Sequence, residues 1–139
     1  FPLYGEKPDN KTNLDLEDDA ARAHMGGDWR MPTQTEIQEL LENTENEWIE
    51  DYNGTEINGM KFTSKINGNS IFIPAAGYCS DGLVYNVGYD GYVWSSSLST
   101  SDPYNAGYFY FGGDSDEDIY CSTSFNFRSK GIVVRGVRK

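Results

Sequence analysis

Carboxylate oxygens are the first groups in this chain that could do chemistry, because one short run is dense in them. Residues 114–118 are Asp-Ser-Asp-Glu-Asp, and converging oxygens of this kind can hold a calcium ion. The run has neither the internal glycine nor the distal glutamate of a helix–loop–helix calcium loop. We therefore expect a solvated acidic loop and no bound metal.

Groups that could act in catalysis are few and lie apart in the sequence. His24 is the single histidine and falls among Ala and Met, where a packing or surface role is expected. The serines at 95–97 lack the flanking glycines that expose a serine nucleophile. Cys79 and Cys121 stand in no metal or redox spacing, although an even count permits one disulfide. We find no catalytic constellation, and we expect neither an enzyme nor a cofactor.

Tyrosine side chains could instead provide contact area and hydrogen bonds for a ligand. Eight of the ten tyrosines lie in residues 66–127, a segment with seven acidic residues and no Lys or Arg. This composition is typical of antibody-like binding surfaces, although turns and solvated loops also use the small polar residues. We favour a ligand-binding surface drawn from one pool of side chains. The pool is Tyr85, Tyr89, Tyr92, Tyr104, Tyr108, Asp114, Asp116, Tyr120, Ser122, Ser124 and Asn126.

Alternation along residues 107–111 predicts which of these rings point outward. On a strand, Tyr108 and Tyr110 share one face, while Phe109 and Phe111 share the other. We expect the phenylalanines to face the core and the tyrosines to face solvent or a ligand.

Other aromatic and aliphatic residues near the acidic run are expected to be structural. Ile119 should be a core anchor inside that run, with Tyr120 outside. Trp29 and Trp94 should fill the core beneath the loops. Arg30 is expected to make structural hydrogen bonds rather than ligand contacts.

Length and charge limit the classes of protein. The 139 residues suit one domain, spanning 1–139, with residues 1–10 as an irregular or truncated N-terminal segment. The net charge of −11 disfavours nucleic acid and anionic membrane surfaces as partners. No apolar run approaches the roughly 20 residues of a spanning helix, so we expect no membrane insertion by this segment. A targeting segment upstream of Phe1 remains open.

A scaffold must position these groups, and the first half of the chain carries helix signals. Asp15 can cap a helix that continues through residues 20–23 and ends at the glycines of 26–27. A sharper start lies at 33–36, where Thr-Gln-Thr-Glu forms a capping box ahead of apolar residues at helical spacing. This second helix should end near residues 43–46.

From Gly59 onward the hydrophobic period changes to that of strands. Residues 59–65 alternate, Asn67-Gly68 is a hairpin signal, and 70–74 is the return strand. Further short strands are expected at 92–95, 107–111 and 132–137, separated by long loops. Two helices followed by strands predict an α+β domain with the helices segregated from an antiparallel sheet.

Four co-linear motifs across about residues 11–139 resemble the Fibrobacter succinogenes major paralogous domain, a family abundant in gut Bacteroidetes. The motifs are Gly26-Gly27-Asp28-Trp29-Arg30-Met31-Pro32-Thr33-Gln34-Thr35-Glu36, Asn67-Gly68-Asn69-Ser70-Ile71-Phe72-Ile73-Pro74-Ala75-Ala76-Gly77-Tyr78, Gly91-Tyr92-Val93-Trp94-Ser95-Ser96-Ser97 with Tyr104-Asn105-Ala106, and Val134-Arg135-Gly136-Val137-Arg138. That family is similar to C-type-lectin-like domains and to the formylglycine-generating-enzyme fold. The resemblance implies two helices packed on small twisted antiparallel sheets, with a long loop-rich second half that presents the ligand surface.

The chain departs from that family and from the C-type lectins in three respects. Relatives have a longer stretch before the first helix, including a strand that pairs with the C-terminal strand, so this pairing is left open here. Residues 112–118 are more acidic than the family pattern. C-type lectins often bind sugar through calcium held by Glu-Pro-Asn and Trp-Asn-Asp tripeptides, whereas Trp94 is followed by serines.

The layout from Trp94 to Arg138 also resembles the variable proteins of diversity-generating retroelements. In those systems, adenine-directed mutagenesis yields mostly Asn, Tyr, Asp, Ser, Gly, Cys and Phe on a C-type-lectin scaffold. Residues 78–128 are enriched in these types. This resemblance implies an alternative function, a variable target-binding protein.

These observations lead to one main hypothesis and two further alternatives. We expect a non-catalytic binding module of a bacterial surface or secreted protein, which meets a glycan or protein on another cell or host surface. Its location would be extracellular or at the cell surface, with a lipoprotein anchor in an upstream segment as one option. The alternatives are a degenerate relative of the formylglycine-generating enzymes and a structural module of a surface assembly.

Overall fold

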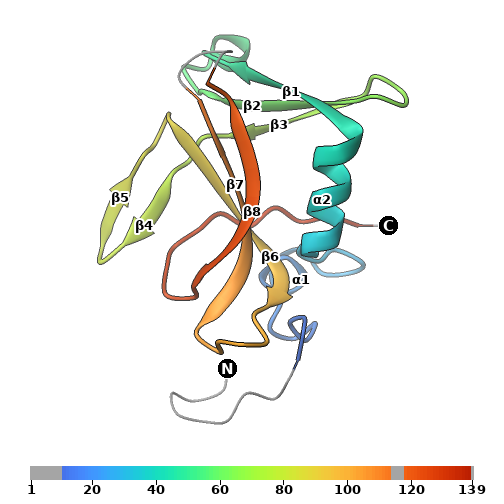
Figure 1. Cartoon of the computed structure of the whole chain (residues 1–139), viewed down its shortest axis with the longest axis vertical. Helices are drawn as coiled ribbons and strands as arrows, with labels where there is room; N and C mark the ends of the chain where they lie inside the picture. The colour runs from blue at the N-terminus through green and yellow to red at the C-terminus, as the bar shows by residue number, and fades with distance from the viewer. Residues whose placement is uncertain (1–10, 114–117, 139) are drawn as a thin grey trace.

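The computed structural model describes residues 11–113 and 118–138 of an α+β chain, which confirms the predicted class (Figure 1). The strands form three antiparallel sheets, ordered β1-β2-β3, β4-β5 and β6-β7-β8. The elements are α1 (Ala20–Met25), α2 (Gln34–Asn43), β1 (Thr44–Ile49), η1 (Tyr52–Gly54), β2 (Gly59–Ser64), β3 (Ser70–Pro74), β4 (Tyr78–Ser80), β5 (Leu83–Tyr85), β6 (Asp90–Leu98), β7 (Asn105–Gly112) and β8 (Tyr120–Phe127). None of the described helices is long and apolar enough to cross a membrane.

The first helix begins later than predicted, because the residue that caps it also binds a residue distant in the sequence. Asp19, not Asp15, caps α1: its Oδ1 accepts the N–H groups of Ala21 and Arg22 at 2.9 and 3.0 Å. The other oxygen of Asp19 accepts the Met31 N–H at 2.8 Å. The buried carboxylate therefore joins the start of α1 to the chain that leads into α2, whereas Asp15 forms an exposed ion pair with Lys11. The helix ends at Gly26, as expected, with φ of +65°.

The second helix begins at the predicted capping box and ends in the predicted region. Thr33 Oγ1 accepts the Glu36 N–H at 3.2 Å, and Glu36 Oε2 accepts the Thr33 N–H at 3.0 Å. The helix ends at Asn43 and passes directly into β1, which sequence reasoning missed. The Thr-Glu-Asn-Glu start of β1 is polar, yet Trp48 at its other end is buried opposite Met60 of β2.

The third sheet differs from the prediction in its last strand. The predicted strands at 92–95 and 107–111 are confirmed and extend into β6 and β7. β8 lies where the sequence predicts a long loop, and it is the third strand of this sheet. The predicted strand at 132–137 is wrong: this segment makes only isolated bridges, from Val133 to Val93 and from Val137 to Arg30.

The core lies between α2 and the two three-stranded sheets. Phe62 of β2 meets Phe109 and Phe111 of β7 edge-on, with centroid distances of 5.7 and 6.0 Å. Ile37 of α2 and Trp48 of β1 belong to the same buried cluster. This packing holds β7 rigidly from its inner side and leaves its outer side for other contacts.

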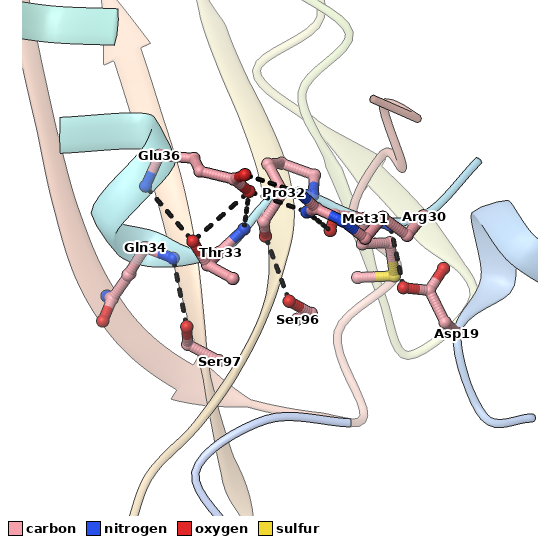
Figure 2. A network of polar contacts seen from close by, with 9 residues as sticks. All are labelled: Asp19, Arg30, Met31, Pro32, Thr33, Gln34, Glu36, Ser96 and Ser97. Atoms are coloured by element: carbon pink, nitrogen blue, oxygen red, sulfur yellow. Dashed lines mark hydrogen bonds and ion pairs between the residues drawn. The ribbon is translucent and has the colours of Figure 1, made fainter. Parts of the chain in front are cut away.

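The start of α2 is tied to β6 by hydrogen bonds that join two of the sequence motifs (Figure 2). The Ser96 N–H donates to Pro32 O at 2.8 Å, and Ser97 Oγ accepts the Gln34 N–H at 3.0 Å. Arg30 donates through both terminal nitrogens to Glu36 at 2.5 and 2.7 Å. The expected structural role of Arg30 is thus confirmed, and the serine motif serves to anchor the helix.

Candidate functional site

The outer side of the β6-β7-β8 sheet collects aromatic side chains from every second position of its strands. In the antiparallel register, Tyr92 lies opposite Tyr110, and Trp94 lies opposite Tyr108. The residues of opposite parity on β7, Phe109 and Phe111, are buried in the core. This confirms the predicted alternation of phenylalanines and tyrosines. We define the tyrosine face as Asp90, Tyr92, Trp94, Tyr108, Tyr110 and Tyr120, with Tyr78 and Tyr85 of the β4-β5 hairpin at its border.

The rings of the tyrosine face contact one another in an unbroken series. Tyr85 stacks on Tyr78 at 5.3 Å between centroids, and Tyr78 meets Tyr92 edge-on at 5.2 Å. The series continues with the pairs Tyr92–Tyr108 at 6.0 Å, Tyr108–Tyr110 at 5.6 Å and Tyr110–Tyr120 at 6.1 Å. The hairpin and all three strands of the third sheet therefore share one aromatic surface.

Asp90 places a carboxylate at one end of this surface. At this end β6 and β8 begin and β7 ends. Asp90 accepts hydrogen bonds from the Tyr120 hydroxyl, from Asn86 Nδ2 at 2.6 Å and from the Tyr92 hydroxyl at 3.4 Å. In the strand register, Gly112 lies between Asp90 and Tyr120. A Cβ on Gly112 would collide with both the Tyr120 hydroxyl and Asp90 Oδ1. The glycine thus lets the two side chains meet across β7.

Three phenols of the face have raised pKa values. Burial raises the pKa of Tyr92 and of Tyr108, and the Asp90 charge raises the pKa of Tyr92 further. For Tyr120, burial and then the hydrogen bond and charge of Asp90 raise the pKa well above the ordinary value. These hydroxyl groups therefore remain protonated at neutral pH.

The predicted pool is brought together only in part. Tyr92, Tyr108 and Tyr120 lie on the tyrosine face, and Ser122 and Ser124 join them because they oppose Tyr110 and Tyr108 in the register. Tyr85 lies at the hairpin border and Asn126 at the far end of β8, opposite Ala106.

The remaining members of the pool lie elsewhere or cannot be placed. Tyr89 is exposed in the turn that precedes β6, and Tyr104 is exposed in the turn between β6 and β7. Within the part of the chain that the structure describes, Tyr89 makes no ring contact with the face. Asp114 and Asp116 lie outside the described residues.

Two tryptophan predictions are wrong. Trp94 is half-buried on the tyrosine face, edge-on to Tyr108 at 6.1 Å, while its neighbours Val93 and Ser95 are buried. Trp29 is half-buried outside the core cluster, with Arg138 over its ring at 5.2 Å. The parity that Trp94 shares with Tyr92 was the available signal, because alternate residues on a strand face the same way.

Sequence reasoning also left Asp90, Tyr78 and Tyr110 out of the pool. Tyr110 could have been included by its parity with Tyr108. Asp90 and Tyr78 reach the face through strand pairing that no local pattern indicated. The predictions for Ile119 and Tyr120 are confirmed: Ile119 packs partly buried against the core, and Tyr120 next to it is exposed.

The β4-β5 hairpin adds an exposed apolar border to the face. It extends away from the rest of the fold in Figure 1, and Leu83, Val84 and Val87 are 60%, 63% and 59% exposed. Such clustering of exposed aliphatic side chains beside aromatic rings is typical of interaction surfaces.

The groups first considered for catalysis have structural contacts here. Ser95 Oγ donates to Gly107 O at 2.8 Å, and Ser97 Oγ donates to Asn13 Oδ1 at 3.2 Å. Both cysteines are free thiols, and burial raises the pKa of Cys121 to about 11, so it stays protonated at neutral pH. Within residues 11–113 and 118–138, no three His, Cys, Asp or Glu side chains are grouped so as to hold a metal ion.

No protein-family model matches the chain, and the comparisons with curated proteins and with solved structures likewise gave no significant match.

Proposed function

We propose that this chain is a non-catalytic ligand-binding module and that the tyrosine face is its binding surface. The observation that carries the proposal is the unbroken series of rings from Tyr85 to Tyr120, which runs from the exposed β4-β5 hairpin across β6, β7 and β8. Aromatic side chains provide large contact areas with few rotatable bonds, and they dominate binding energy in many interfaces.

The support of the face by the core favours binding over a purely structural role. β7 is fixed from within by Phe109 and Phe111, and the start of α2 is tied to β6 by Ser96 and Ser97. A surface held in this way loses little conformational entropy when a ligand binds. The proposal includes a C-type-lectin-like fold and a place on a bacterial cell surface or outside the cell, as the sequence resemblance implies.

The test is a screen of printed glycans and immobilised proteins with the wild-type chain and two variants. In the first variant, Tyr92→Ser and Tyr108→Ser are combined, which removes two central rings from the face. In the control, Tyr52→Ser removes a ring that stacks on Phe72 in a different part of the molecule, at 3.9 Å. We expect binding that the double variant loses and the control keeps, with similar melting temperatures.

Three results would contradict the proposal. The first is binding that is indifferent to Tyr92 and Tyr108, and the second is no binding to any member of the screen. The third is turnover of a cysteine-containing acceptor peptide, which would favour a relative of the formylglycine-generating enzymes.

A further inference from the structure

We infer that the ligand of the tyrosine face is a basic protein segment, whose Arg or Lys side chain lies on the rings beside Asp90. The inference rests on the proposed function and names the chemistry of the partner. Three properties of the molecule lead to it: the distribution of charge, the partners of Asp90, and the position of Lys130.

The charge of this part of the chain is one-sided. β6, β7, β8 and the β4-β5 hairpin all lie within residues 66–127, which contain seven acidic residues and no Lys or Arg. Four of these acidic residues, Asp81, Asp90, Asp102 and Asp118, belong to the described part of the chain, and Asp90 is the one on the tyrosine face. Lys130 reaches the border of the face at Tyr78, so the charge beside Asp90 favours a cationic ligand over an anionic one. A basic partner complements this surface, whereas an acidic glycan or a nucleic acid does not.

Asp90 is the group on the tyrosine face to which a cation of the partner would bind. Its three hydrogen-bond donors, Tyr120, Asn86 and Tyr92, are all neutral, and within the described residues no cation forms an ion pair with it. A carboxylate has about four acceptor positions, so one remains for an incoming donor. The neutral donors leave its charge uncompensated, and a cation placed there would be attracted by both the carboxylate and the adjacent rings.

Lys130 shows that the aromatic surface already accommodates a cation of this chain. Its Nζ lies 5.5 Å from the centroid of the Tyr78 ring and donates to Ser80 Oγ at 2.7 Å. This is within the range of a cation–π contact, about 6 Å. Tyr78 is in turn edge-on to Tyr92, so Lys130 occupies the border of the face and leaves the rings next to Asp90 to a partner.

The experiment measures calorimetric binding of two synthetic peptides to the full chain. One is a nine-residue peptide of three Gly-Arg-Ser repeats. The other has citrulline in place of each arginine, which keeps the shape and removes the charge. We expect the arginine peptide to bind and the citrulline peptide to bind at least about fivefold more weakly.

Two variants locate the site. Asp90→Asn should weaken binding of the arginine peptide about fivefold or more. Glu39→Gln is the matched control, because it removes one negative charge from an exposed position on α2; it should leave binding within about twofold. Tyr108→Leu, which keeps bulk but removes the ring, should also weaken binding.

Each outcome separates this inference from the proposed function. Equal binding of the two peptides, or equal effects of Asp90→Asn and Glu39→Gln, would overturn the inference. So would wild-type binding of a neutral hexasaccharide in place of the arginine peptide; if Tyr92→Ser and Tyr108→Ser abolished that binding, the proposed function would stand. If Asp90→Asn lowered the melting temperature too far for binding measurements, the two peptides on the wild-type chain would still decide.

Discussion

Glu36 shows how one side chain can start a helix and orient a cation at the same time. It completes the capping box with Thr33, and it accepts two hydrogen bonds from Arg30. The hydrogen bond from Arg30 is the main reason that the pKa of Glu36 is lowered to about 2, with a further contribution from the Thr33 N–H; partial burial opposes both. The sequence motif at 26–36 is therefore a structural junction rather than a chemical site (Figure 2).

The lowered pKa predicts acid sensitivity at this residue. Because the folded-state pKa of Glu36 lies below its ordinary value of 4.5, its stabilisation is complete above about pH 4.5 and is lost as the pH falls through about 2. At pH 7, Glu36→Gln should lower the free energy of unfolding by about 1 kcal/mol. The difference between wild type and variant should shrink as the pH falls towards 2. Urea unfolding at several pH values checks this, and a constant difference would show that the charge is not the cause.

At the scale of elements, strand parity decides the role of each aromatic residue. Trp48 and Trp94 are both on strands, but Trp48 points into the core and Trp94 lies on the tyrosine face. The core side of β6 that was predicted for Trp94 is occupied by its neighbour Val93, because adjacent residues on a strand face opposite ways.

The two tryptophans should therefore differ in their contribution to stability. Trp48→Ala should cost about 3–5 kcal/mol, because it leaves a cavity in the core. Trp94→Ala should cost about half of that or less, since its ring remains partly in water. Chemical unfolding of the two variants provides the measurement. An equal loss in both would mean that the outer face contributes to the fold as much as the core does.

For the molecule as a whole, the segment after β8 closes the fold. It pairs with β4 at Gly131, with β6 at Val133, and with the approach to α2 at Val137. The Val137 N–H donates to Arg30 O at 2.8 Å, and the Arg30 N–H donates to Val137 O at 3.0 Å. Three parts of the chain are thus joined by isolated bridges rather than by a strand.

This closure predicts an unusual sensitivity to proline near the C-terminal end. Val137→Pro removes the donor to Arg30 and should destabilise the chain by about 1–3 kcal/mol. The Arg30 amide should also exchange its hydrogen faster, because its acceptor sits in the same bridge. Val137→Ala keeps the N–H and serves as the control. Unchanged exchange at Arg30 in the proline variant would show that the bridge contributes nothing.

Local chemistry alone determined several elements of this protein. The capping box at 33–36, the Asn67-Gly68 hairpin, the glycine stop at Gly26 and the alternation of phenylalanines and tyrosines on β7 all appear as predicted. Each depends on residues that are neighbours in the sequence, so the information is present in a short window. The same patterns predicted the α+β class and placed Tyr92, Tyr108 and Tyr120 in the pool.

Only the tertiary structure decided the features that depend on distant partners. The hydrogen bond from the Met31 N–H holds Asp19 at the start of α1, where it caps the helix. Pairing with β2 places the polar start of β1 in a sheet, and pairing with β7 makes residues 120–127 a strand. The pairing of β6, β7 and β8 also brought Asp90 and Tyr120 together across Gly112, from positions far apart in the chain. No local propensity contains such information, because a hydrogen bond between strands is specified by the register of the whole sheet and by the core that holds it.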